Sequence, residues 1–325
     1  MQTPNVSIII PCYNAEKTIK TTIASVKAQT YKNFEVIFIN SGSTDNTLSV
    51  IENCLLGSDL NYKVLTYENK GVSVARNSGI EASCGKYLMF LDADDIYHPS
   101  MVRYLVELIE NTNTDTVFCS FTRNIDKLYD EKFDNIGKTI LFSNYQLQEN
   151  LLFQYIPCGM TMFIFKKQIL NQFMIHFTPK TNYGEDREFT WKYLCHCNSG
   201  IALDMQLYGY FDNPHSATNN VSISKLDLLT AMYRVDEYLQ KNNSSFSSVF
   251  HKFGCSRILW TILKTFSKAN RRDLFNSCIN PKEAKKHMRQ LLLFPDFRIK
   301  VTSLIYIISP TLFFEGIKKF YRIGG

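Results

Sequence analysis

The sequence predicts an α/β fold with a mostly parallel central sheet, helices on both faces of that sheet, and a helical extension at the C-terminus. Three observations lead to this prediction. In the first third of the chain, short β-rich runs alternate with segments of helical pattern. Nearly every position in those runs is apolar, which is typical of parallel strands covered on both faces. After about residue 222 the pattern is helical alone.

The predicted elements follow one another in a regular order. Strands are predicted from the runs VSIII (6–10), FEVIFI (34–39), KVLTY (63–67), YLMFL (87–91), TVFCSF (116–121) and, near 160–166, MTMFIFK. Helices are predicted between them at 16–28, 45–56, 72–83 and 100–112. Ser, Thr and Asp at 43–47 are typical of a helix start. In such sheets ligands bind outside the carboxyl ends of the strands.

Charge is distributed unevenly along the chain. The formal net charge is +6, with 18 Lys and Arg against 7 Asp and Glu from Ser216 onward, and 18 against 23 before it. The opposite net charges of the first and last parts of the chain indicate that these two regions have different functions. We therefore predict one domain over 1–220 and a basic, mainly helical region over 221–325.

Cysteine usage and the N-terminus bear on location. The nine cysteines are scattered without the spacing of a zinc site, which is typical of reduced thiols in a cytosolic protein. The N-terminal apolar run is short and no basic segment precedes it, so we expect no signal peptide. No stretch reaches the roughly 18 apolar residues of a membrane span. These features predict a cytoplasmic location.

Three aspartates in four positions follow the apolar run at 87–91: Asp92, Asp94 and Asp95. Adjacent carboxylates raise one another's pKa unless a cation offsets their repulsion. Mg²⁺ or Mn²⁺ is commonly held by one or two carboxylates together with substrate phosphates. The other interpretation is an acidic loop that caps the helix beginning near Ser100. The three residues alone leave both interpretations open.

Three further segments place polar residues at turns. The run NKGVSVARNSGI (69–80) sets Arg76 between glycines at a helix start, where it could pair with a phosphate. The run NYGEDREF (182–189) sets Glu185 and Asp186 in a turn that follows a glycine, and GYFDNPHSATN (209–219) sets His215 in a polar loop. Each also has a structural interpretation: a surface arginine, an acidic helix N-terminus favoured by the helix dipole, and a surface histidine.

Taken together and in this order, these segments resemble glycosyltransferase family 2, whose members have the fold called GT-A. The matching segments are PCYN (11–14), QTYKNFEVIFINSGSTDNT (29–47), NKGVSVARNSGI (69–80), LDADD (91–95), GEDREF (184–189) and NPHSATN (213–219). The resemblance covers roughly the first 220 residues. It implies that 1–220 is a GT-A domain that binds a nucleotide-sugar and carries the catalytic residues.

The resemblance also implies roles for individual residues. Those implied to contact the nucleotide-sugar are Pro11, Tyr13, Asn14, Ser41, Arg76, Asp92 and Asp95. Asp94 would bind a divalent metal, Mn²⁺ or Mg²⁺, and His215 would lie near the metal and the diphosphate. Asp186 would be the catalytic base, with Glu185 as its neighbour.

One departure from the family's pattern concerns the nucleotide base. The family commonly has two acids before the GST sequence, and Asn40 and Ser41 stand there in this chain. In UDP-using members the second acid accepts the N–H of uracil. Ser41 can accept the same hydrogen bond, although a neutral acceptor is weaker than a carboxylate. UDP is therefore the favoured carrier.

The function that the resemblance implies is inverting, metal-dependent transfer of a hexose or N-acetylhexosamine from a UDP-sugar. The acceptor would be a growing glycan or lipid-linked glycan in bacterial surface polysaccharide synthesis. The alternatives are transfer to polyprenyl phosphate or to a protein, and a catalytically silent module that binds nucleotide-sugars. The basic charge alone would allow nucleic-acid binding, but no recognised motif supports it and we expect none.

The basic tail over 296–325 has two interpretations. It mixes bulky apolar residues with Arg298, Lys300, Lys318, Lys319 and Arg322. Such a tail can form a helical hairpin that packs on the rest of the protein. It can also lie on an anionic membrane surface, which would place the protein at the inner face of the cell membrane.

Overall fold

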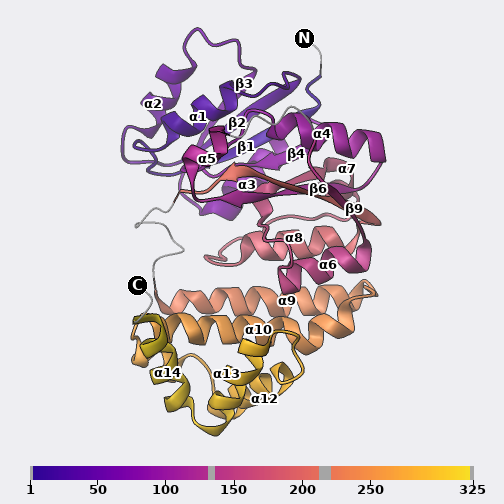
Figure 1. Cartoon of the computed structure of the whole chain (residues 1–325). Helices are drawn as coiled ribbons and strands as arrows, with labels where there is room; N and C mark the ends of the chain where they lie inside the picture. The colour runs from indigo at the N-terminus through magenta and orange to yellow at the C-terminus, as the bar shows by residue number, and fades with distance from the viewer. Residues whose placement is uncertain (1–2, 131–135, 212–220, 323–325) are drawn as a thin grey trace. The chain divides into compact units, whose positions relative to one another are not determined.

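The computed structural model describes residues 3–130, 136–211 and 221–322 (Figure 1). Internal packing divides the chain into two units. Met1–Lys180 and Phe189–Asn213 form one, here called the sheet unit. Thr181–Glu188 and Pro214–Gly325 form the other, here called the helical unit. The short segment Thr181–Glu188 therefore packs with the C-terminal helices, which the sequence pattern does not indicate. The boundary near residue 220 stays a prediction.

The sheet unit is built on a mixed sheet that is parallel where the first strands lie. Among the described residues the sheet has nine strands in the order β3-β2-β1-β4-β8-β6-β9-β5, with β7 also paired to β9. The strands are β1 Val6–Cys12, β2 Phe34–Ser41, β3 Tyr62–Tyr67, β4 Tyr87–Phe90, β5 Ile96–Tyr97, β6 Thr116–Thr122, β7 Thr139–Ser143, β8 Phe163–Lys166 and β9 Ser199–Gly209. The predicted α/β class with a mostly parallel central sheet is confirmed.

The four parallel strands β3, β2, β1 and β4 end at the same edge of the sheet. Cys12 of β1 pairs with Asn40 of β2, and Asn40 pairs with Thr66 of β3. On the other side of β1, Ile9 pairs with Phe90, the last residue of β4. All of β2 and β4 is buried, as the apolar runs predict. The loops that follow these strands therefore emerge side by side.

Helices cover this sheet at the places where the helical pattern predicts them. In the sheet unit they are α1 Ile19–Lys27, α2 Thr47–Leu55, α3 Val72–Ala82, α4 Met101–Thr112, α5 Ile125–Asp130, α6 Asn144–Phe153 and α7 Lys167–Gln172, and α8 Glu185–Cys195 begins in the helical unit. Helix α4 shows the expected stripe, because Val102, Leu105 and Ile109 are buried. The described part of the chain also contains α5, α6, α7 and β7, which the sequence pattern does not indicate.

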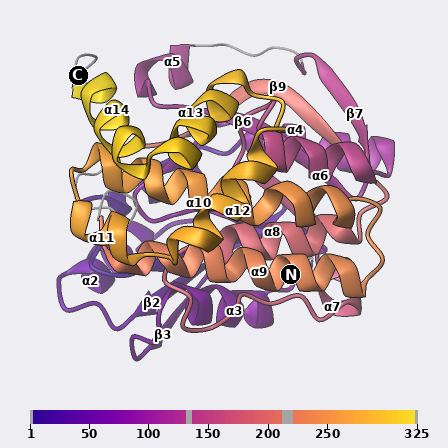
Figure 2. The same ribbon diagram turned by 90° about the horizontal axis from the view of Figure 1, so that it is seen from below.

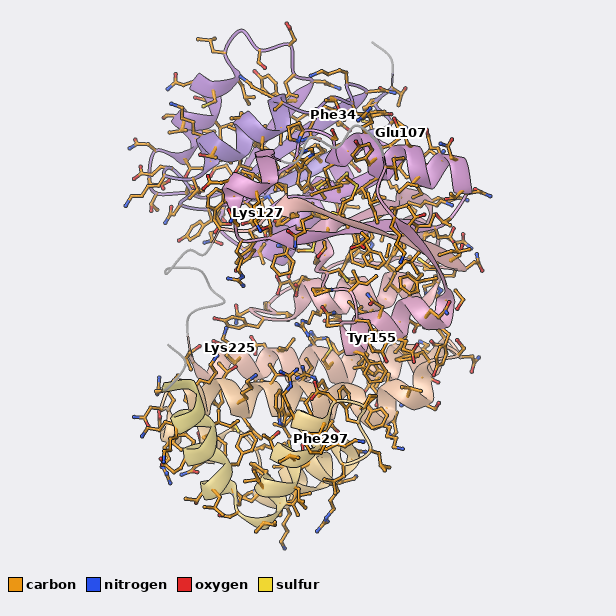
Figure 3. All side chains as sticks on the ribbon, viewed as in Figure 1. Phe34, Glu107, Lys127, Tyr155, Lys225 and Phe297 are labelled. Carbon is orange, nitrogen blue, oxygen red and sulfur yellow. The ribbon has the colours of Figure 1, made fainter. Side chains whose placement is uncertain are left out.

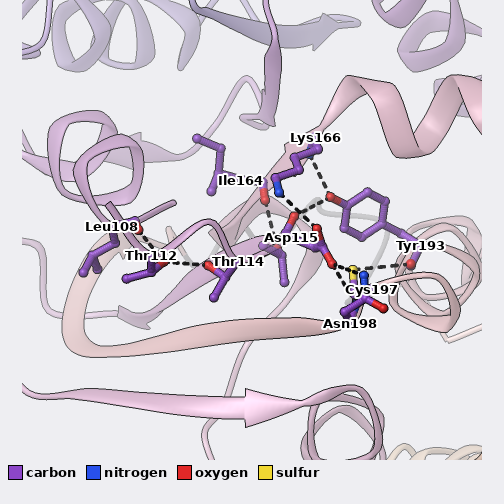
Figure 4. A network of polar contacts seen from close by, with 10 residues as sticks. Leu108, Thr112, Thr114, Asp115, Ile164, Lys166, Tyr193, Cys197 and Asn198 are labelled. Atoms are coloured by element: carbon purple, nitrogen blue, oxygen red, sulfur yellow. Dashed lines mark hydrogen bonds and ion pairs between the residues drawn. The ribbon is translucent and has the colours of Figure 1, made fainter. Parts of the chain in front are cut away.

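A polar network fixes the end of α8 against the sheet (Figure 4). Asp115, just before β6, is at its centre, with one carboxylate oxygen 3.0 Å from Nζ of Lys166. The other oxygen accepts the backbone N–H of Asn198 at 2.7 Å. The hydroxyl of Tyr193 on α8 donates to the backbone oxygen of Asp115 at 2.7 Å. This network lies at the amino end of β6, so it supports the fold and not the ligand edge.

The helical unit consists of helices that pack around α10 (Figure 2). They are α9 Leu226–Lys241, α10 Ser247–Lys268, α11 Arg272–Ser277, α12 Pro281–Leu291, α13 Phe297–Ile308 and α14 Pro310–Arg322. Helices α9, α12 and α14 each contact α10, and α13 contacts both α12 and α14. The predicted helical extension is therefore confirmed, and residues 242–246 separate α9 from α10.

The last two helices are packed on one side and exposed on the other. Ile299, Ser303 and Tyr306 of α13 are buried, as are Phe313 and Phe314 of α14, so the hairpin packs on its neighbours. The opposite side is apolar and exposed. It consists of Phe297, Val301, Leu304 and Ile308 of α13 together with Leu312 at the start of α14, whose exposed fractions range from 39% to 75%. We call this set the exposed face of α13. None of the helices in the described residues is both long and apolar enough to cross a bilayer.

Candidate functional site

The loops after β1 and β2 are joined by hydrogen bonds at the carboxyl edge of the sheet. The side-chain oxygen of Asn14 accepts the backbone N–H of Thr44 at 2.8 Å. In return, the backbone N–H of Asn14 donates to the hydroxyl of Ser43 at 3.1 Å. Asn14 has a φ of 47°, a left-handed conformation that Asn tolerates better than most residues. Asn14 thus shapes the loop, while Tyr13 beside it is 53% exposed and available to a ligand.

Gly42 brings the loop after β2 close to the loop after β3. Its φ is 65°, and a Cβ at this position would lie 2.9 Å from the backbone nitrogen of Asn69. Only glycine fits such a close approach in this conformation. Ser41 immediately before it is 7% exposed, and the side-chain oxygen of Asn40 accepts the N–H of Ser43 at 3.2 Å. Asn40 is therefore occupied in holding the turn, and Ser41 ends β2 at this edge.

Arg76 lies at the same edge and is paired with the first aspartate of the cluster. Its Nη2 is 2.9 Å from Oδ1 of Asp92. The guanidinium lies 5.4 Å from the centre of the Phe177 ring, and the residue is buried. Arg76 belongs to α3, which follows Gly71 with a φ of 89°. A cationic group from α3 thus meets the negative charge that follows β4.

The three aspartates occupy different environments. Asp95 is 2% exposed, and its two oxygens accept the hydroxyl of Tyr208 at 2.6 Å and the N–H of Phe211 at 3.0 Å. Burial, and then the charge of Asp92, raise the pKa of Asp95 to about 8. Asp92 and Asp94 are only half-buried. These two hydrogen bonds give Asp95 a structural role. The contact of Asp95 with a donor sugar stays a prediction.

Among the described residues, the metal ligand predicted at this edge is Asp94, and the carboxylate of Asp92 lies two residues before it. Within residues 3–130, 136–211 and 221–322, no group of three or more His, Cys, Asp or Glu side chains is arranged to hold a metal ion. Two carboxylates at a strand end nevertheless suit Mg²⁺ or Mn²⁺, which take oxygen ligands and complete their coordination with phosphates and water. The donor set therefore fits a metal that binds together with a diphosphate.

Glu185 and Asp186 form the first turn of α8, within the helical unit. Acids at a helix N-terminus are stabilised by the helix dipole. Gly184 precedes them with a φ of 88°, and a Cβ there would lie 2.5 Å from the Leu228 side chain of α9. Glu185 is buried and Asp186 is half-buried. The glycine before this turn is thus required both by its backbone conformation and by its packing.

Helix α9 holds this acidic turn in place through contacts that the sequence pattern does not reveal. The guanidinium of Arg234 binds the buried carboxylate of Glu188 at 2.5 to 3.1 Å. The same guanidinium donates to the hydroxyl of Thr181 at 3.0 Å. Both amides of Asn182 donate to one oxygen of Asp227, at 3.2 Å for the backbone and 2.9 Å for the side chain. Hydrogen bonds and an ion pair to α9 therefore hold the residues both before and after Asp186.

A cation also covers Tyr183 in this turn. Nζ of Lys225, labelled in Figure 3, lies 4.0 Å from the centre of the Tyr183 ring. Burial lowers the pKa of Lys225. An ammonium over an aromatic face is attractive, and more so away from water. This cation–π contact is a third interaction between the acidic turn and the residues at the start of α9.

The structure thus places the candidate residues in two groups. The sheet unit brings together the carboxyl ends of β1, β2 and β4 with α3, and these carry Pro11, Tyr13, Asn14, Ser41, Arg76, Asp92, Asp94 and Asp95. Glu185 and Asp186 belong to the helical unit. His215 lies outside the described residues. The roles of all these residues stay predictions.

Comparison with known proteins identifies the family of this chain. The sequence profile of glycosyl transferase family 2 matches residues 7–173, just over half of the chain. The chain belongs to glycosyl transferase family 2. The matched region contains the strands, the Arg76–Asp92 pair and the aspartate cluster. The resemblance seen in the sequence is therefore confirmed, and the protein is a glycosyltransferase.

Two curated relatives of this chain are named as glycosyltransferases. The chain is 26% identical over 297 residues to "Uncharacterized glycosyltransferase EpsJ" of Bacillus subtilis, covering 89% of this chain and 83% of that one. It is 31% identical over 183 residues to the Escherichia coli "UDP-Glc:alpha-D-GlcNAc-diphosphoundecaprenol beta-1,3-glucosyltransferase WfgD", covering 55% of this chain and 66% of that one. Relatives of this chain therefore include a bacterial enzyme that acts on a lipid-linked glycan.

A solved structure supports the fold over nearly the full length. The structure of Staphylococcus aureus TarS residues 1–349 in complex with UDP-GlcNAc has a TM-score of 0.65 and 19% identity to this chain. The match covers 98% of this chain and 92% of TarS 1–349. At this identity the likeness concerns the fold, which is GT-A, and it includes the part of the chain after residue 220.

Proposed function

We propose that this protein transfers a hexose or N-acetylhexosamine from a UDP-sugar to a hydroxyl group of a bacterial surface glycan, with inversion at the anomeric carbon. One observation carries the proposal: Arg76, Asp92 and Asp94 gather where parallel strands end, in a chain of family 2. A cation beside two half-buried carboxylates suits a diphosphate that binds with a divalent metal. The similarity to WfgD supports a UDP-sugar donor and a lipid-linked acceptor, and the similarity to TarS, solved in complex with UDP-GlcNAc, supports a UDP-sugar donor.

The proposed chemistry gives each step to a named residue. Asp186 takes the proton of the acceptor hydroxyl, whose oxygen forms a bond to C1 of the donor sugar. The bond between C1 and the diphosphate breaks, and its electron pair leaves with the nucleoside diphosphate. Arg76 stabilises the diphosphate oxygens. A metal held by Asp94, with Asp92 beside it, would supply Lewis-acid stabilisation of the same leaving group.

The experiment that tests the function measures release of nucleotide from a panel of UDP-sugars, with and without Mn²⁺. A glycosyltransferase without its acceptor commonly hydrolyses its donor slowly, so we expect metal-dependent UDP release with one or a few sugars. Binding of UDP-sugars without release, in the presence of both metal and candidate acceptors, would favour the silent binding module instead. Thermal shift shows which ligands bind, because a ligand of the folded state raises its apparent stability.

Ser41 provides a test of the nucleotide base. We expect UDP to bind more tightly than GDP or dTDP, and Ser41→Asp to tighten UDP binding, because a carboxylate accepts a stronger hydrogen bond from the uracil N–H. Asn40→Asp is the matched control, since it adds the same charge one residue earlier at a side chain that holds the turn. Tighter binding of GDP than UDP by calorimetry would contradict this assignment.

The exposed face of α13 supports the proposed membrane contact. Val301, Leu304 and Ile308 would enter the headgroup region, and nearby Lys and Arg would each contribute about 1 kcal/mol on an anionic surface. Because the other side of α13 is packed, substitution tests this contact better than truncation. Changing these three residues to Ser should lower the partition coefficient onto anionic vesicles by more than about tenfold.

The control for this prediction is a triple change of Leu56, Leu141 and Met174 to Ser, which removes similarly exposed apolar side chains from the sheet unit. It should leave co-sedimentation with vesicles unchanged. High salt should weaken binding of the unmodified protein. If the unmodified protein stays in the supernatant at both low and high salt, the membrane contact has no support.

A further inference from the structure

The helical unit contains a cavity that the proposed transfer reaction does not use. Its volume is about 470 Å³, within the range of roughly 300 to 1,000 Å³ that is usual for sites of small ligands. Helices α10, α13 and α14 supply its walls. The lining is largely apolar and includes Trp260, Ile299, Ile305, Phe313 and Ile317.

Cations gather on the α10 wall of this cavity. The guanidinium of Arg257 and the ammonium of Lys264 lie 4.8 and 5.0 Å from the ring of Trp260. These three residues are spaced three and four apart, so they share one face of α10. Arg298 from α13 also lines the cavity. Positive charge from two helices therefore borders an apolar space.

Little negative charge lies beside Arg257. Among the described residues that line the cavity, Asp296 is the one acidic side chain. Its Oδ1 accepts the backbone N–H groups of Arg298 and Ile299 at the start of α13, and its Oδ2 lies 3.4 Å from Nη2 of Arg298, so its charge is already paired with Arg298. No acidic side chain in the described part of the chain lies within ion-pair distance of Arg257. Burial, and then the charge of Arg187, lower the pKa of Arg257 to about 10. A ligand anion would relieve this unfavourable burial of charge.

The cavity is continuous with the exposed face of α13. Phe297, Val301 and Leu312 belong to that face and also line the cavity, and Phe297 is labelled in Figure 3. A molecule that enters from an apolar surface would therefore pass these side chains first. It would then meet Trp260 with Arg257 and Lys264. The cavity therefore has exposed apolar side chains where it meets the exposed face of α13, and positively charged side chains along its α10 wall.

We propose that this cavity binds one phosphate-bearing lipid, with its phosphate against Arg257 and Lys264 and the first part of its hydrocarbon chain along α13 and α14. The proposal deepens the membrane contact proposed above and rests on it. Two features select this class of ligand together. An inorganic phosphate or a nucleotide would leave the apolar walls uncovered, and an uncharged lipid would leave the half-buried cation of Arg257 without an anion.

The test uses the fluorescence of Trp260 in the full-length protein. The chain has two tryptophans, so Trp191→Phe leaves Trp260 as the single emitter. Geranylgeranyl phosphate, added below the concentration at which it forms micelles, should change this fluorescence saturably. Geranylgeraniol and inorganic phosphate serve as probes of the chain alone and of the phosphate alone. Each should bind at least about tenfold more weakly than geranylgeranyl phosphate, because geranylgeraniol lacks the phosphate and inorganic phosphate lacks the hydrocarbon chain.

Variants of α10 locate the site. Lys264→Gln should weaken binding of geranylgeranyl phosphate by about tenfold, since it removes a charged hydrogen-bond donor but keeps the length of the side chain. Lys252→Gln is the matched control, because Lys252 is exposed on the same helix and does not line the cavity. It should bind as the unmodified protein does. Trp191 is buried, so calorimetry with the unmodified protein repeats the titration without relying on the Trp191→Phe change.

Three results would overturn the proposal: no saturable binding by calorimetry, equal binding of geranylgeraniol, or equal weakening by Lys252→Gln and Lys264→Gln. Calorimetry with UDP, run on the same samples, keeps this outcome separate from the transfer function. Loss of lipid binding with UDP binding intact would remove the lipid site alone. Loss of UDP binding in the unmodified protein would instead contradict the proposed donor.

Discussion

Replacing Asp186 by Asn is expected to lower kcat by roughly 10² to 10⁴-fold, while the Kd for the donor changes little. Positioned general-base catalysis contributes a factor of this size, and Asn cannot accept the proton of the acceptor hydroxyl. Asn keeps the volume of the side chain and can still cap the first turn of α8. The measurements are single-turnover transfer with saturating donor and metal, and calorimetric titration of the donor.

Asp227→Asn is the matched control for Asp186→Asn. Asp227 is an acid that supports the same turn, since one of its oxygens accepts both amides of Asn182. Asn at position 227 keeps an acceptor oxygen, so we expect most of the turnover to remain. If Asp186→Asn abolished donor binding and left the turnover of bound donor unchanged, Asp186 would be a binding residue and not the base.

Replacing Asp94 by Ala is expected to lower kcat by about 100-fold or more and to remove the effect of metal on nucleotide binding. The reason is that a metal supplies several kcal/mol of stabilisation to the leaving group, and 1.36 kcal/mol corresponds to tenfold in rate. EDTA should abolish turnover of the unmodified protein, and Mn²⁺ or Mg²⁺ should restore it. Calorimetry of UDP with and without metal gives a second readout that does not depend on turnover.

Asp95→Asn provides the contrast for the Asp94 prediction. The two oxygens of Asp95 accept hydrogen bonds from the buried hydroxyl of Tyr208 and from the backbone N–H of Phe211, so loss of the carboxylate should lower the melting temperature. Asp94→Ala should instead leave the protein folded, because Asp94 is half-buried at a loop. Full activity in Asp94→Ala would show that this carboxylate does not hold a required metal.

The sequence predicted the strands of the parallel half well because their apolar runs are continuous. It missed β9, Ser199–Gly209, where Asp204 and Gln206 are exposed and interrupt the apolar pattern. Periodicity reports burial over neighbouring residues, so a long strand with exposed positions near its middle gives a mixed signal. The family resemblance, which depends on the spacing and order of motifs, was not affected by this gap.

The partners of the site residues could not be predicted from local pattern. Asp95 bonds to Tyr208, and Arg234 of α9 bonds to Glu188 beside the acidic turn. Both pairs join residues that are far apart in the sequence. Nothing in the runs around Asp95 or Glu188 distinguishes a side chain that supports the structure from one that meets a ligand. The tertiary fold makes that distinction.

The C-terminal tail shows a different limit of prediction from sequence. Val301 and Leu304 are exposed, whereas Ile299 and Tyr306 are buried in the same helix. Because both sides of α13 carry apolar residues, composition alone could not decide between a packed hairpin and a membrane-facing segment. The structure shows that one side of α13 is packed and that the other is exposed. The packed hairpin is therefore confirmed, and contact of the exposed side with a membrane stays a prediction.

The anomeric configuration of the released sugar tests the central claim most directly. A UDP-α-sugar that the protein turns over in the presence of Mn²⁺ would be followed by proton NMR, before mutarotation equilibrates the anomers. Single displacement at C1 predicts that the β anomer forms first and that UDP forms at the same rate. Initial release of the α anomer would contradict the inverting mechanism, and no release from any UDP-sugar, with metal and lipid-linked acceptors present, would contradict the transferase itself.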